Sequence, residues 1–106
     1  NLIDNEEIIL PRMTNDSTDA FHLYIIRLRG GQKRRDNLYK KFLSCGIRTS
    51  VHYKPIHKFA IFKKMAKGYD ELKKSELFYN EIISLPFYPQ ITKKEQDIVI
   101  QCIADE

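Results

Sequence analysis

The feature that most limits the possible folds is a β-rich segment that runs through two glycines directly into an amphipathic helix. Residues 20–29 are dense in strand-forming side chains, and Gly30 and Gly31 end the run. Residues 33–44 then place apolar side chains at helical spacing, and Gly46 stands where a C-terminal helix cap is expected. This succession predicts a sheet covered by helices on at least one face, which is an α/β fold of two layers.

Further strands are expected on the C-terminal side of this unit. Residues 47–53 alternate between apolar or β-branched and polar side chains, which predicts a strand that Pro55 ends. With the strand and helix before it, this segment would complete a βα-crossover unit. Residues 84–89, Ser-Leu-Pro-Phe-Tyr-Pro, fit a short edge strand. We therefore expect a small mixed sheet of about three strands.

Three more helices are expected. Residues 59–66 fit a short helix that ends near Gly68, and residues 70–83 carry an apolar stripe at helical spacing. The clearest signal is Thr92-Lys-Lys-Glu95, a capping box that opens a helix with apolar residues on one face.

A chain of 106 residues has room for one hydrophobic core. We expect residues 1–19, which carry Pro11 and a polar cluster, to be a lead-in, and residues 20–106 to be the folded domain. The start shows neither an initiator Met nor a secretion-signal pattern, so we expect a piece of a longer product. The apolar runs are strand-length, too short to cross a membrane, and two cysteines predict free thiols in a reducing cytoplasm.

The net charge of +4 is unevenly distributed. Residues 27–41 hold seven Lys or Arg against one Asp, and such a patch suggests an anionic partner. It also fits a solvated helix face, and Tyr39 is the single aromatic residue available there for base stacking. The patch therefore gives little support to a nucleic-acid-binding module, which is one alternative function for this chain. A pure interaction domain, with no small ligand, is another alternative.

Polar and ionisable side chains are concentrated in residues 51–57, Val-His-Tyr-Lys-Pro-Ile-His, at the end of an expected strand, where α/β folds usually bind their ligands. Two histidines five residues apart, with no Cys or Asp nearby, leave a tetrahedral metal shell half empty, so no metal site is expected. The sequence also lacks a Gly-x-Ser-x-Gly elbow and a phosphate-binding glycine loop. The chain offers no self-contained reaction centre.

Residues 46–57, Gly-Ile-Arg-Thr-Ser-Val-His-Tyr-Lys-Pro-Ile-His, resemble a signature of the DegT/DnrJ/StrS family of aminotransferases, which act on nucleotide-linked keto-sugars. The strand before it, the Arg35-Asp36 pair, and the spacing from Glu76 to residues 84–89 and Thr92 agree with the same family. The resemblance covers about residues 20–103. One departure from the family pattern is residues 58–62, Lys-Phe-Ala-Ile-Phe, where many relatives carry Leu-Gln-Pro-Tyr-Tyr. The resemblance therefore does not identify the sugar or the shape of its pocket.

The resemblance implies a homodimeric enzyme that uses pyridoxal phosphate (PLP) to move an amino group from glutamate to a nucleotide-sugar. It implies that this chain is the C-terminal small domain, which closes the substrate cleft over its own large domain and is inactive alone. The Schiff-base lysine would belong to the large domain, so none of the twelve lysines here is expected to be catalytic.

Carried over to matching positions, the resemblance implies that Ser50, His52, Tyr53 and His57 contact the substrate. Their expected task is hydrogen bonding and stacking that orient the nucleotide-sugar. The alternative for Tyr53 and His57 is that they only pack the joint between the strand and the turn.

Overall fold

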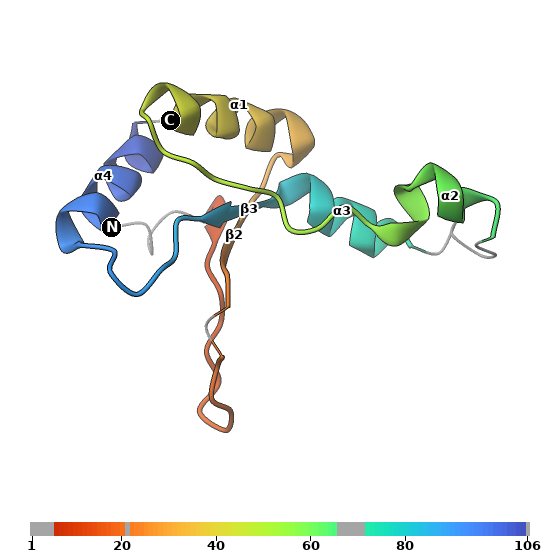
Figure 1. The fold of residues 1–106 in the computed structure, drawn as a ribbon, viewed down its shortest axis with the longest axis horizontal. Coiled ribbons are helices and arrows are strands. Elements are labelled where there is room, and N and C mark those ends of the chain that lie inside the picture. The colour runs from red at the N-terminus through yellow and green to blue at the C-terminus, as the bar shows by residue number, and fades with distance from the viewer. Residues whose placement is uncertain (1–5, 21, 66–71, 106) are drawn as a thin grey trace.

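The computed structural model describes residues 6–20, 22–65 and 72–105, which form a three-stranded sheet packed with helices (Figure 1). This confirms the expected fold class. In chain order the elements are β1 (Ile8–Ile9), β2 (Tyr24–Leu28), α1 (Gly31–Ser44), the 3-10 helix η2 (Ile56–Lys58), α2 (Ala60–Lys63), α3 (Lys73–Glu81), β3 (Ile82–Leu85) and α4 (Lys93–Ala104).

The sheet has the order β1-β2-β3, with β2 in the centre, and both pairings are antiparallel. The third strand is not the one expected. Residues 47–53 make only an isolated bridge, Ser50 to Ser84, so the predicted crossover unit is wrong and the sheet is not mixed. The third strand is instead β1, a two-residue strand inside the expected lead-in, which pairs Ile8 with Leu28.

The core lies between the sheet and the helices α1 and α4. Its side chains come from all three strands, from both helices and from the segment after α1. They are Ile8, Ile26, Leu28, Leu38, Phe42, Ile47, Ile83, Val99, Cys102 and Ile103. Burying apolar side chains of this size contributes about 1.5–3 kcal/mol each, so this cluster is the main source of stability.

The ends of α1 and α4 follow the signals in the sequence. Gly46, with φ +72°, ends α1 in the left-handed region that favours glycine, and its amide donates to the Leu43 carbonyl. At α4, the Thr92 hydroxyl accepts from the Glu95 amide at 3.2 Å, and the Glu95 carboxylate accepts from the Thr92 amide at 2.7 Å. The predicted capping box is confirmed.

Two parts project from the sheet and its covering helices, which we call the body (Figure 1). The link between β1 and β2 extends away as a long hairpin, and residues 11–20 are all exposed. On another side, residues 53–65 and 72–80 form an arm that contains η2, α2 and most of α3 (Figure 1). The expected helices at 59–66 and 70–83 correspond to the shorter α2 and α3, and the end near Gly68 lies outside the described residues.

No helix within the described ranges is long and apolar enough to cross a membrane.

Candidate functional site

The candidate site lies where the segment after α1 passes from the body to the arm. This segment is held to β3 at one point, because the Ser50 amide donates to the Ser84 carbonyl at 3.2 Å and the Ser84 amide donates to the Ser50 carbonyl at 2.7 Å. Beyond this bridge Pro55 precedes η2, and the chain turns onto the face of α3. The four predicted residues lie along this path.

Ser50 and His52 meet at Ser84. Nδ1 of His52 lies 2.9 Å from the Ser84 hydroxyl, which is itself buried on β3. The Ser50 side chain is exposed beside the same bridge. Ser84 was not predicted as a site residue, because its contact with His52 joins residues 32 apart and leaves no local pattern.

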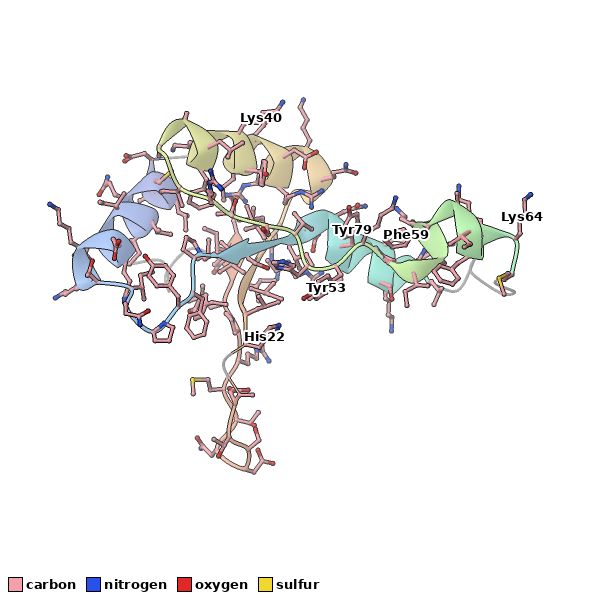
Figure 2. All side chains as sticks on the ribbon, in the orientation of Figure 1. His22, Lys40, Tyr53, Phe59, Lys64 and Tyr79 are labelled. Atoms are coloured by element: carbon pink, nitrogen blue, oxygen red, sulfur yellow. The ribbon has the colours of Figure 1, made fainter. Side chains whose placement is uncertain are left out.

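Tyr53 and His57 line one groove of about 790 Å³ on the arm. Apolar residues from α2 and α3, among them Phe62 and Phe78, form much of its wall. Tyr53 is 67% exposed, and Figure 2 shows it at the inner end of the arm, far from Lys64 at the outer end. A largely apolar groove with a phenol and an imidazole in its wall suits a ligand that combines a flat ring with hydroxyl groups.

His52 and Tyr53 link the two halves of the site. Their ring centroids lie 4.8 Å apart at an interplanar angle of 59°, a tilted contact typical of packed aromatic rings. The peptide bond between them is cis. All four predicted residues thus follow one continuous path, with Ser50 and His52 beside β3 and with Tyr53 and His57 in the groove.

His57 has a fixed orientation. Its Nε2 lies 2.8 Å from the Glu76 carboxylate on α3, and Nζ of Lys58 lies 3.4 Å from the other oxygen of that carboxylate. The hydrogen bond with His57, followed by the charge of Lys58, holds the pKa of Glu76 below its usual value of 4.5. Glu76 appeared in the sequence only as a spacing marker, and its contact with His57 was not predicted.

Tyr79 is a third site residue that the sequence did not single out. Its ring lies 5.4 Å from the Arg35 guanidinium and 5.9 Å from Nζ of Lys58, within the range of cation–π attraction. The ring also lines the groove near His57. Cations from the body and from η2 therefore hold this part of the groove wall.

The basic patch predicted at residues 27–41 is partly engaged within the chain. Arg27 pairs with Glu81, and Arg34 lies 2.7 Å from Glu7. Arg35 is only 4% exposed and donates to Asp36 at 2.7 Å. These internal contacts reduce the charge that is available to a nucleic-acid backbone.

The groove on the arm does not supply the full set of groups that PLP needs. A PLP site needs a lysine for the Schiff base, a partner for the pyridine nitrogen and donors for the phosphate. Among the described residues that line the groove, Lys74 is the one lysine, it is exposed, and no carboxylate accompanies it. Nor do the described residues contain a cluster of three or more His, Cys, Asp or Glu that suits a metal ion.

Comparison with curated proteins gives relatives in sugar metabolism. The spore coat polysaccharide biosynthesis protein SpsC of Bacillus subtilis is 29% identical over 92% of this chain and 26% of its own length. The dTDP-3-amino-3,6-dideoxy-alpha-D-galactopyranose transaminase of Aneurinibacillus thermoaerophilus is 28% identical over 95% of this chain and 26% of its own. The chain thus spans about a quarter of the length of the curated relatives it matches.

Solved structures share the fold. DesV of S. venezuelae, in complex with a ketimine intermediate, superposes with a TM-score of 0.86 and 28% identity over 98% of this chain and 27% of that one. The Streptococcus pneumoniae protein Spr1654 in its PLP-form superposes with a TM-score of 0.81 and 24% identity over 92% of this chain and 26% of that one. A family model matches residues 1–104, and the chain therefore belongs to the DegT/DnrJ/EryC1/StrS aminotransferase family.

Proposed function

We propose that this chain is the substrate-closing part of a PLP-dependent enzyme that transfers an amino group from glutamate to a nucleotide-linked keto-sugar. The observation that carries the proposal is the match of the family model to residues 1–104, in a chain whose motif residues Tyr53 and His57 line one groove. The transaminase from A. thermoaerophilus supports a sugar bound to a nucleotide as the substrate class.

In this proposal, residues 20–106 are the C-terminal small domain, and residues 1–19 lead into it and add β1 to its sheet. The cofactor is held by the large domain of the same protein. The chain covers about a quarter of the length of its curated relatives, which supports a part of a longer enzyme that is inactive alone. PLP would supply the group that carries the amino nitrogen between donor and acceptor. The parent enzyme would be a cytoplasmic homodimer.

The chain's own residues would bind and orient the sugar. Tyr53 presents an exposed ring and hydroxyl at the groove, and Ser50 and His52 present polar groups at the adjoining edge of β3. His57, held by Glu76, would fix one wall and donate or accept a hydrogen bond to a sugar hydroxyl through Nδ1. Such contacts position the acceptor and leave bond-breaking to groups outside this chain.

The test uses the full-length enzyme and separates its two half-reactions. With His52→Ala, we expect kcat/KM for the nucleotide-sugar to fall by about tenfold or more, and the conversion of bound PLP by glutamate to change less than about twofold. The reason is that the His52 contact would be made with the sugar and not with the amino donor. Absorbance of the cofactor in single-turnover experiments follows both halves.

Lys40→Ala is the matched control, because Lys40 is exposed on α1 and Figure 2 shows it on the outer side of that helix, away from Tyr53. It is expected to leave both half-reactions unchanged. Equal losses in both half-reactions for His52→Ala would contradict a role in sugar binding.

A further inference from the structure

The two cysteines meet in the body, on the opposite side of the fold from the arm. Cys45 follows the last turn of α1, and Cys102 lies on α4, 57 residues later. The Cys102 thiol donates to Sγ of Cys45, with 3.2 Å between the sulfur atoms. The sequence predicted two free thiols but gave no sign that they touch.

The two thiols differ in access. Cys45 is exposed, whereas Cys102 is 5% exposed within the hydrophobic core. Burial, and then the hydrogen bond to Cys45, raise the pKa of Cys102 to about 11. Reagents in the solvent therefore react with Cys45 first. Cys102 is less reactive because neighbouring side chains cover it and because its thiol stays protonated.

A cation accompanies the pair. The ammonium of Lys41 is buried on α1, one turn before Cys45, and it has no hydrogen-bond partner among the described residues. Its charge favours the thiolate at Cys102, and Asp105 opposes that effect. A thiolate formed nearby would give this ammonium a counter-charge.

We propose that Cys45 and Cys102 form a reversible disulfide site that is oxidised by small-molecule disulfides. The Cys45 thiolate attacks one sulfur of the reagent, which gives a mixed disulfide at Cys45 and releases one thiol. Cys102 then loses its proton and attacks Sγ of Cys45, which closes the protein disulfide and releases the second thiol. Two protein thiols are oxidised and one disulfide is reduced to two thiols, and the product joins α1 covalently to α4.

The first experiment treats the native protein with oxidised glutathione, blocks remaining thiols with an alkylating reagent and digests with trypsin without reduction. The cleavage sites place Cys45 in peptide 42–48 and Cys102 in the peptide that begins at Glu95. We expect these two peptides to appear as one disulfide-linked species that disappears after reduction. A protein that carries only glutathione adducts, or that forms the link only in denaturant, would overturn the proposal.

Single substitutions test the order of the two steps. With Cys102→Ala, we expect the glutathione adduct at Cys45 to accumulate, because the second thiol is missing. With Cys45→Ala, we expect Cys102 in the folded protein to stay unmodified over the time in which the wild type forms its link. Rapid modification of Cys102 in that variant would contradict the assigned order. The wild-type peptide map needs no substitution, so a misfolded variant does not leave the question open.

Lys41→Met tests the cation, since it keeps the length and apolar stem of the side chain. We expect the rate of link formation to fall by about threefold or more, because the thiolate loses a favourable charge. Lys40→Met, on the exposed face of the same helix, is the matched control and is expected to keep the wild-type rate. Equal rates for Lys41→Met and the wild type would show that Lys41 does not assist formation of the disulfide.

Discussion

The body and the arm differ in how fully they bury their largest apolar residues. In the body, large side chains such as Ile26, Phe42 and Ile83 are completely buried. In the arm, η2 and α2 bury no residue, and Tyr53, Phe62 and Phe78 are 67, 42 and 46% exposed. The difference indicates that the body supplies the stability of the fold, while the arm keeps apolar surface available for binding.

The largest expected effect tests this division directly. Phe42→Ala should lower the free energy of unfolding by about 3–5 kcal/mol, because it leaves a cavity in a closed core. Phe62→Ala, the matched change in the arm, should cost less than about 1 kcal/mol, because the ring is already partly in water. Urea unfolding followed by circular dichroism measures both. Similar costs at the two positions would break the comparison.

An intermediate effect is expected where the arm joins the body. Glu81, at the end of α3, is 8% exposed and pairs with Arg27 on β2, whose side chain is 36% exposed. Glu81→Ala should cost about 1–2 kcal/mol, since partial access to water screens the pair. A double-mutant cycle with Arg27→Ala should give a coupling energy of about 1 kcal/mol. A coupling energy near zero would mean that the ion pair does not hold the arm.

The smallest effect concerns the arm alone and depends on pH. The pKa of Glu76 is lowered by its hydrogen bond with His57, so the ionised carboxylate stabilises the fold above its usual pKa of 4.5. That contribution is lost as the pH falls below 4.5 and through the lowered pKa. The melting temperature of the wild type should therefore exceed that of Glu76→Gln at neutral pH, and the two should converge at low pH.

Asp16→Asn, in the exposed hairpin, is the control for the loss of one carboxylate. A gap between wild type and Glu76→Gln that stays constant from neutral to acidic pH would show that the contact with His57 does not depend on the charge of Glu76.

The sequence predicted the body better than the connections within it. The strand β2, the helix α1 and the capping box at Thr92 depend on local patterns of strand formers, apolar spacing and caps. The alternation at residues 47–53 has another cause. Ile47 and Thr49 turn into the body and are each 8% exposed, but only Ser50 pairs with a neighbouring strand. A segment whose side chains alternate between buried and exposed has the sequence pattern of a strand even when its backbone forms no ladder of hydrogen bonds with a neighbouring strand.

The strand β1 was missed because two isoleucines in a polar segment give no periodic signal. The candidate site shows the same limit. The motif identified His52 and His57, but their partners Ser84 and Glu76 lie 32 and 19 residues further along the chain. Such contacts depend on how the elements are brought together, which local spacing does not record.

The junction between α3 and β3 has a mechanical consequence. The helix ends at Glu81 and the strand begins at Ile82, with no loop between them. One peptide linkage therefore joins α3 to β3, and Ser84 is the third residue of that strand. Because Ser84 contacts His52, a tilt of α3 would also move the edge of the sheet beside His52, with no loop to absorb the movement.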